Sequence, residues 1–330
     1  MKLNTKRTVL VGFAFFLICL FWQAYDSIIP KILTDKFGMS QLWSGFIMAL
    51  DNILAVFLLP IFGAISDKHN GKRGRRTPFI LIGTLIAAVT FFGLTFADNM
   101  QLSNVQPIPE LADPTVENTG ALTMLYGDDV AFIDPAADSV VKTKTTLRAL
   151  YPDTGTIGTL VAAGDEAATA RLTAARQAWA WQKTVSHPLT LIVFIVLLLI
   201  TLLAMSSFRS PAVALMPDVT PKPLRSRANA IINLMGAFGG ILVLGLGIVL
   251  GTGKPENTFM SYTLFFGLCI GIMLIALVVF MLTVKEPAWA KEAAEINDKA
   301  DAENEKELVE RLEIIAKLTR EEAKAQLIAQ

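Results

Sequence analysis

Cysteine, histidine and charged residues are all scarce in this sequence. Its 330 residues include two cysteines and two histidines, and only 18% are Asp, Glu, Lys or Arg. Cys19 and Cys269 are too few and too far apart for a disulfide framework, and the two histidines do not complete a zinc site with them. Lys plus Arg and Asp plus Glu are equal at 29 each, so no overall positive field favours nucleic acid. We therefore expect no metal, no cofactor and no nucleic-acid partner.

Apolar residues, by contrast, are abundant. They make up 53% of the chain, which includes 20 phenylalanines, and the mean hydropathy is +0.51. A helix needs about 20 apolar residues to cross a bilayer. Six stretches are long enough: Thr8–Pro30, Leu42–Ile65, Pro78–Ala97, Leu189–Met216, Ala228–Gly251 and Phe259–Val284. The predicted fold class is therefore an all-α integral membrane protein with six transmembrane helices, and the lipid bilayer is its first partner.

The Lys and Arg residues between these stretches are unevenly distributed. Eleven lie at the N-terminus and in the loops after the second and fourth spans, namely Lys2, Lys6, Arg7, Lys68, Lys72, Arg73, Arg75, Arg76, Lys222, Arg225 and Arg227. The opposite short loops hold three, Lys31, Lys36 and Lys254. Short cytoplasmic loops carry an excess of positive charge. We expect a multi-pass protein of the cell membrane, plasma or inner, with both termini in the cytoplasm.

Two segments are too polar to span a membrane. Residues 98–188 are expected outside the cell, as an insert between residues 1–97, with helices one to three, and 189–284, with helices four to six. The insert is interpreted either as a loop with little structure or as a small cap over a pathway. Its expected elements are short strands within 129–134, 139–151 and 155–163, and a helix over 164–184. Residues 285–330 are expected to form a charged cytoplasmic helix, with Leu308, Leu312, Ile315 and Leu318 along one stripe.

The loop after the second span carries the most informative motif. Residues 63–80 read GAISDKHNGKRGRRTPFI, which resembles the loop between helices two and three of the major facilitator superfamily. Residues 209–218 and 225–229, RSPAVALMPD and RSRAN, resemble the sucrose-transporter-like and glycoside–pentoside–hexuronide symporter branches. The resemblance covers the six spans and excludes the insert. It implies a secondary transporter that works by alternating access, with a sugar or glycoside as its substrate.

Members of that family have twelve spans in two halves, and this chain resembles the N-terminal half. The tail resembles the segment that joins the halves. The resemblance implies a fragment that works with a C-terminal half. The alternative is that two copies pair, as parallel repeats do.

The same motif predicts a gating latch at the cytoplasmic edge. Gly63 and Gly74 give close approach and a tight turn, and Asp67 is an acceptor for Arg75 or Arg76, whose guanidinium groups suit carboxylates. Arg209 is predicted to lie near this depth. The alternative is that these basic residues only anchor the loop in the cytoplasm.

Charged residues inside spans are expensive and indicate function. At 1.5 Å per residue, Asp51 lies about 14 Å below the outer end of its span, too far from Arg209 to pair with it. We interpret Asp51 as a proton carrier and Asn52 as a ligand for hydroxyl groups. The neighbouring span adds aromatic and polar groups at Trp22, Gln23, Tyr25 and Asp26. The alternatives are an aromatic belt for the two rings, a surface position for Asp26 and an interhelical hydrogen bond for Asp51.

The acidic positions that the symporter branch has further along the second span are Ala55 and Leu59 here, so protons are favoured over sodium. The leading hypothesis is proton-coupled sugar uptake. A drug or metabolite exporter and a membrane scaffold or receptor acting through the insert remain alternatives. The sequence contains no nucleophile–base pair or phosphate-binding loop in a plausible context, so we do not expect an enzyme.

Overall fold

The computed structural model describes residues 3–105, 130–137, 143–254, 257 and 259–328, with side chains described as far as Leu312. Six of its helices are long and apolar enough to cross a membrane. They are α1 (Thr5–Lys31), which continues as the π-helix η1 (Ile32–Lys36), α2 (Gln41–Lys68), α3 (Thr77–Val105), α8 (Pro188–Val219), α9 (Arg225–Val249), preceded by the 3-10 helix η3 (Lys222–Leu224), and α10 (Thr263–Thr283). The predicted all-α membrane bundle is confirmed.

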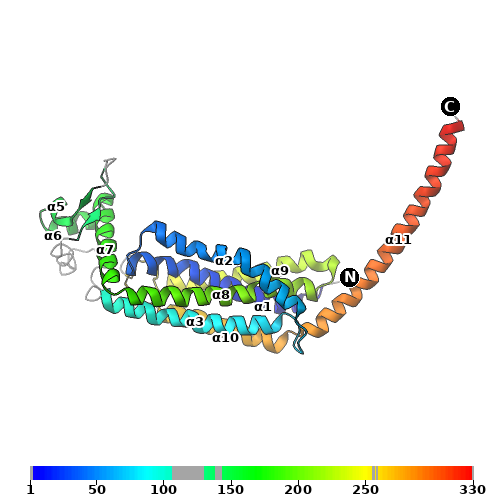
Figure 1. The fold of residues 1–330 in the computed structure, drawn as a ribbon, viewed down its shortest axis with the longest axis horizontal. Coiled ribbons are helices and arrows are strands. Elements are labelled where there is room, and N and C mark those ends of the chain that lie inside the picture. The colour runs from blue at the N-terminus through cyan, green and yellow to red at the C-terminus, as the bar shows by residue number, and fades with distance from the viewer. Residues whose placement is uncertain (1–2, 106–129, 138–142, 255–256, 258, 329–330) are drawn as a thin grey trace.

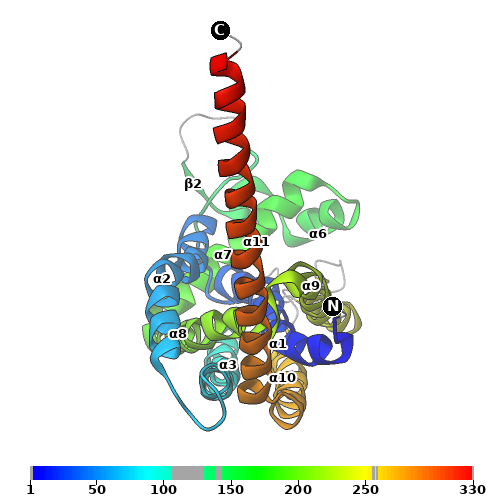
Figure 2. The same ribbon diagram turned by 90° about the vertical axis from the view of Figure 1, so that its right-hand side faces the viewer.

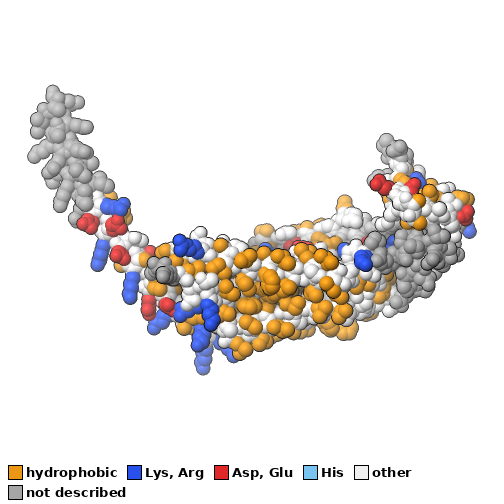
Figure 3. All heavy atoms as spheres, turned by 180° about the vertical axis from the view of Figure 1, so that it is seen from behind, with side chains coloured by type: hydrophobic (Ala, Val, Ile, Leu, Met, Phe, Trp, Pro, Cys, Tyr) orange, Lys and Arg blue, Asp and Glu red, His pale blue; other side chains and the backbone are white. Residues whose placement is uncertain are grey.

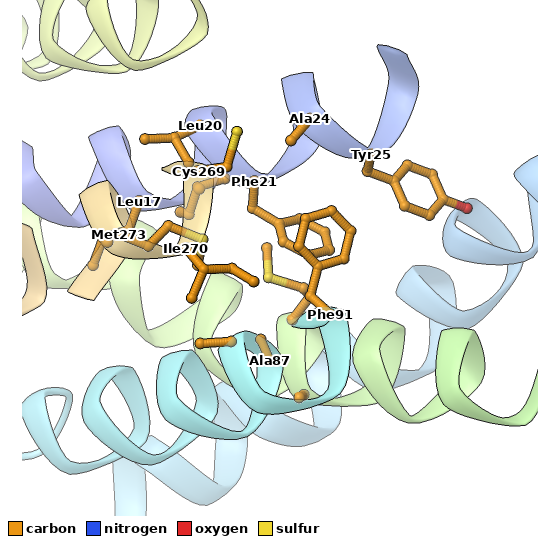
Figure 4. Packing of buried hydrophobic residues seen from close by; sticks show 14 of the residues in the cluster. Leu17, Leu20, Phe21, Ala24, Tyr25, Ala87, Phe91, Cys269, Ile270 and Met273 are labelled. Carbon is orange, nitrogen blue, oxygen red and sulfur yellow. The ribbon is translucent and has the colours of Figure 1, made fainter. Parts of the chain in front are cut away.

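The six spans lie side by side in one bundle (Figure 1). α3 packs along α8, α1 packs along α9, and α10 contacts both α1 and α3. Side chains from α1, α3 and α10 meet in the core, where the ring of Phe91 lies 4.7 Å from that of Phe21 and 4.6 Å from that of Phe266, centroid to centroid (Figure 4). This apolar packing holds the bundle together along its whole length.

The outermost helices of the bundle are α2 and α9. α2 buries only Ser44, Ile47 and Ser66, while its Val56 and Phe57 are exposed. On the face seen in Figure 3, apolar side chains cover the middle of the bundle and Lys and Arg side chains gather at the end where the tail leaves. An apolar surface with charges confined to its ends suits a bilayer.

Several helix starts follow from local sequence. Asn4 accepts a hydrogen bond from the backbone N–H of Arg7 and so caps α1. Ser40 caps α2 in the same way, through the N–H of Trp43. Such side chains satisfy backbone donors that have no partner within the helix.

The third span is longer than the sequence indicated. It was expected to end at Ala97, with the polar insert starting at residue 98, but α3 continues to Val105. Asp98 and Gln101 are fully buried in this extension. Because Lys36 neutralises Asp98, the polar residue does not force the helix to end.

Part of the insert forms a small folded unit, which we call the cap (described residues 130–186). Strands β1 (Phe132–Ile133) and β2 (Lys144–Thr145) pair antiparallel, and α5 (Leu147–Leu150), α6 (Thr154–Ala162) and α7 (Glu166–Ser186) follow. Ile157, Leu172 and Trp179 belong to a separate apolar core. The helix expected over 164–184 is confirmed as α7, and short strands lie within the first two expected segments as β1 and β2. Residues 147–150 of the second segment form helix α5 instead of a strand. Residues 129 and 139–142 of these segments lie outside the described residues.

The strand expected over 155–163 is wrong, because this segment is helix α6. Asp153 accepts hydrogen bonds from the N–H and hydroxyl of Thr156, which starts the helix. Ile157 and Val161, spaced four residues apart, are then both buried on one face.

The tail forms α11 (Glu286–Ile328), as expected. It leaves the bundle at the end opposite the cap and extends away from it (Figures 1 and 2). Leu308 and Leu312 are exposed on it, whereas the side chains of Ile315 and Leu318 lie outside those described.

Candidate functional site

Arg76 is the centre of a charged cluster at the end of the bundle where the tail begins. Its Nε donates to Asp218 of α8 at 2.8 Å, and its two Nη atoms donate to Ser66 and Asp67 of α2. The guanidinium of Arg75 lies 3.7 Å from the same Asp218 carboxylate. The structure therefore brings Asp67 together with Arg76, as the motif indicated, and adds Asp218 as a second acceptor.

Glu286, the first residue of α11, completes this cluster from the other side. Its carboxylate accepts hydrogen bonds from the backbone N–H groups of Arg75, Arg76 and Thr77 at 2.6, 2.9 and 2.7 Å, and from the Thr77 hydroxyl at 2.6 Å. It thus occupies the N-terminus of α3, where negative charge is favourable. Sequence analysis missed this role. The available signal was an acid two residues after the end of the last expected span.

Gly74 is needed for that contact. Its backbone has φ +107°, and an added Cβ would lie 2.3 Å from the Glu286 carboxyl carbon. Gly63 is a second close approach, since a Cβ there would lie 3.0 Å from Ser210 Oγ on α8. Both glycines therefore hold α2, α8 and α11 closer than a side chain would permit.

Electrostatics stabilise the charged form of Arg76. Burial acts to lower the pKa of Arg76, but the hydrogen bonds and charges of Asp218 and Asp67 outweigh burial and hold it above its usual value. Arg76 therefore stays cationic, and any rearrangement here exchanges its acceptors rather than its proton.

Arg209 lies outside this cluster. Arg209 is half-buried, and its guanidinium carbon lies 5.3 Å from the centroid of the Trp22 ring on α1. Among the described residues it forms no ion pair with Asp67, Asp218 or Asp51, the last as the depth argument indicated. About two and a half turns of α8 thus separate Arg209, which lies against α1, from Asp218, which binds Arg76.

Arg209 instead joins what we call the intramembrane polar group, with Trp22, Gln23, Tyr25 and Asp26 on α1 and Asp51 and Asn52 on α2. Asn52 donates to Asp51 at 2.9 Å, and Gln23 donates to Ser27 at 3.2 Å. The Tyr25 hydroxyl interacts electrostatically with both Asp26 and Asp51. The structure therefore places Tyr25 and Asp26 of α1 near Asp51 of α2, whereas Gln23 bonds within its own helix and lies beside Gly240 of α9.

Two polar atoms of this group have no hydrogen-bond partner in the described structure. They are the Trp22 indole nitrogen and the Tyr25 hydroxyl, both buried. Figure 4 shows the Tyr25 ring extending away from the packed core. Tyr25 is fully buried, which argues against a membrane-interface belt for this ring. An unpartnered buried donor costs about 1–3 kcal/mol, so these two atoms mark a place where a polar partner is favoured.

A buried ion pair at the cap end was missed by sequence analysis. Lys36 Nζ lies 2.6 Å from Asp98 and donates to the Met260 carbonyl at 2.7 Å, and both charged side chains are fully buried. Gln101 donates to the Lys36 carbonyl and to Thr184 of α7, each at 2.8 Å. The pair thus connects η1, α3, the cap and the segment before α10. Lys36 was counted only as a loop charge.

No metal centre is found in the described part of the chain, where no three His, Cys, Asp or Glu residues are grouped suitably. The polar group and the charged cluster are therefore the arrangements from which function has to be argued.

Two family models match the chain. Residues 10–112 match a model described as MFS/sugar transport protein, and residues 172–322 match the model of the Major Facilitator Superfamily. The first match includes the intramembrane polar group on α1 and α2 and the Asp67–Arg76 pair. Comparison with curated proteins and with solved structures finds no match. Together with the six-helix bundle, the two family matches show that the chain is a membrane transporter of the major facilitator superfamily.

Proposed function

We propose that this transporter takes up a sugar or glycoside across the cell membrane by alternating access, with protons as the coupling ion. The intramembrane polar group carries the proposal. It combines an aromatic surface, the unpartnered donors of Trp22 and Tyr25, and the carboxylates of Asp26 and Asp51. Hydroxyl-rich ligands need both donors and acceptors, and their C–H faces pack on aromatic rings. The description of the first matching family, sugar transport, supports the same substrate class.

The charged cluster around Arg76 supplies the gate in this proposal. Asp67 is more than half exposed, so it can leave Arg76 for water, whereas Asp218 is mostly buried beside it. Movement of α2 against α8 then exchanges the acceptors of one permanently charged guanidinium. The excess of Lys and Arg at this end supports its placement in the cytoplasm, together with both termini. Labelling of Thr145→Cys and Gly71→Cys variants with an impermeant thiol reagent tests this orientation; labelling of Gly71→Cys from outside would contradict it.

Part of the intramembrane polar group is exposed on the bundle surface, which implies that another protein surface covers it. Asp26 and Asn52 are exposed on the bundle surface, and a charge against lipid costs at least about 2.5 kcal/mol. We propose that a second six-helix bundle, either a C-terminal half or a second copy, covers this face and encloses the substrate. The exposed apolar residues of α2 and α9 fit such a neighbour as well as lipid.

Counterflow tests the substrate class. Membranes containing the chain and the bundle that faces it are loaded with unlabelled sucrose or maltose, and entry of the radiolabelled sugar is measured. We expect transient accumulation of the sugar and none of a lipophilic cation. Accumulation of the cation alone would identify an exporter of drugs or metabolites and overturn the sugar assignment.

Asp51→Asn tests the coupling ion. The amide still hydrogen-bonds a hydroxyl group but carries no proton, so we expect loss of pH-driven accumulation while downhill exchange at equal pH continues. Uptake with and without a pH gradient, beside exchange, measures both activities. The matched control is Asp298→Asn, the same substitution at an exposed carboxylate of α11, outside the spans. Full gradient-driven accumulation by Asp51→Asn would remove Asp51 from the coupling step.

A further inference from the structure

A cavity of about 280 Å³ lies where the cap meets the bundle, apart from the intramembrane polar group. Its walls come from η1, the start of α2, α6, α7 and Phe259. α7 crosses this end of the bundle in Figure 1. The volume is slightly below the range of pockets for drug-sized ligands, about 300–1,000 Å³, and so suits a small molecule.

Arg176 of α7 is the notable residue of this cavity. Its guanidinium carbon lies 5.6 Å from the centroid of the Phe259 ring, yet among the described residues it makes no ion pair and no hydrogen bond. Arg171, five residues earlier on the same helix, differs: it donates to both oxygens of Asp134, at 2.9 and 3.0 Å. Burial lowers the pKa of Arg176, and Asp35 only partly opposes this. A desolvated guanidinium that has no anion of its own favours an incoming one.

The described charges around the cavity leave a positive excess. Asp35 interacts electrostatically with Arg176, Lys31 and Lys36, but it is the acceptor of an ion pair with none of them. Lys36 is paired with Asp98, and Lys31 donates to the Thr252 carbonyl at 2.6 Å. Among the described residues, three cations thus share two carboxylates, and one positive charge remains for a ligand.

The other polar side chains of the cavity can accept hydrogen bonds. The Thr34 hydroxyl donates to the Pro30 carbonyl at 2.9 Å and toward the Asp35 carboxylate at 3.0 Å. The Thr173 hydroxyl donates to the Thr169 carbonyl at 2.9 Å, so the lone pairs of both hydroxyl groups stay available. The Gln41 amide lines the cavity and makes no hydrogen bond within the described structure. A ligand that donates from hydroxyl groups and carries one negative charge matches this set.

We propose that this cavity binds a small hydroxylated carboxylate, with Arg176 holding the carboxylate and Thr34, Thr173 and Gln41 accepting its hydroxyl groups. The guanidinium fork binds both carboxylate oxygens, as Arg171 does with Asp134. The site is formed by the cap and the bundle end, so binding here is separate from transport and does not depend on the substrate of the intramembrane group.

Calorimetric titration of the purified chain in detergent tests the site with four probes. D-Gluconate carries both features, sorbitol lacks the carboxylate, acetate lacks the hydroxyl groups, and inorganic phosphate is an unrelated anion. We expect saturable binding of gluconate, and binding at least about tenfold weaker for each of the others. Undetectable gluconate binding overturns the proposal. Sorbitol or phosphate binding as tightly as gluconate overturns the hydroxylated-carboxylate assignment.

Variants then assign the residues. Arg176→Gln keeps a donor and removes the charge, and we expect gluconate affinity to fall by about tenfold or more. Lys183→Gln removes a positive charge from the same helix outside the cavity, and we expect it to bind gluconate with the affinity of the unsubstituted protein. Equal loss in both variants would indicate a general charge effect and overturn the site.

Thermal unfolding shows whether Arg176→Gln is folded. Thr173→Phe provides an independent answer if it is not, because Thr173 is exposed and a phenyl group there fills the cavity without entering a core. A folded Thr173→Phe variant that loses gluconate supports the site, and one that binds gluconate normally overturns it.

Discussion

Two clusters of charge at opposite ends of the bundle differ in their access to water. At the tail end, the Arg76 side chain is 6% exposed, but its acceptors Asp67 and Asp218 are 58% and 19% exposed. At the cap end, Lys36 and Asp98 are both 0% exposed. The first cluster can exchange a carboxylate for water. The second cannot open without leaving a buried charge unpaired, so it acts as a fixed point of the fold.

The cost of opening each cluster follows from this difference. Removing one partner of a buried pair typically costs about 3–5 kcal/mol, whereas an exposed pair contributes about 0–1 kcal/mol. Rearrangement during transport is therefore compatible with the Arg76 cluster and not with the Lys36–Asp98 pair.

Asp98→Asn gives the largest expected effect. It leaves Lys36 charged and buried, and we expect destabilisation of about 3–5 kcal/mol and little folded protein. Size-exclusion profiles and thermal unfolding in detergent measure this. The double variant Lys36→Met with Asp98→Leu removes both charges and should recover most of the folded protein. An unchanged unfolding temperature for Asp98→Asn would show that the pair is not a fixed point.

Asp67→Asn is expected to act on transport and not on folding. The amide weakens the exposed contact with Arg76, so stability should change by less than about 1 kcal/mol. Uptake should fall by about tenfold, which corresponds to roughly 1.4 kcal/mol lost from one of the transporter's states. Lys68→Gln, the adjacent exposed charge outside the cluster, is the control for insertion and uptake. Normal uptake by Asp67→Asn would leave the cytoplasmic-anchor interpretation of the motif.

Acidification is expected to give the smallest effect, confined to the cap. The hydrogen bonds from Arg171 hold the pKa of Asp134 below its usual value in the folded cap. The carboxylate therefore stabilises the folded cap above about pH 4, and this contribution is lost as the pH falls below that value. Hydrogen exchange of α7 peptides, corrected for intrinsic rates, should rise on acidification. Asp134→Asn should exchange faster at neutral pH and show a weaker pH dependence; equal profiles would contradict the role of Asp134.

Local patterns in the sequence were sufficient for the spans and for part of each site. The six apolar runs predicted the membrane helices because helical length and bilayer thickness are both fixed quantities. The spacing from Asp67 to Arg76 indicated their contact because a short turn leaves few alternatives. The stretches around Trp22 and Asp51 indicated polar residues at neighbouring depths in the membrane, because depth in a span follows from residue count.

Long-range contacts decided the rest. Lys36 with Asp98 and Glu286 with the start of α3 join residues that are far apart in the chain, and their charges look like ordinary loop charges until the helices pack. The direction of Arg209 toward Trp22 depends on how α8 is rotated against α1. The sequence by itself determined which segments cross the membrane, because hydropathy acts locally. Only the tertiary structure decided which charges are buried and paired, because burial depends on neighbours supplied by other helices.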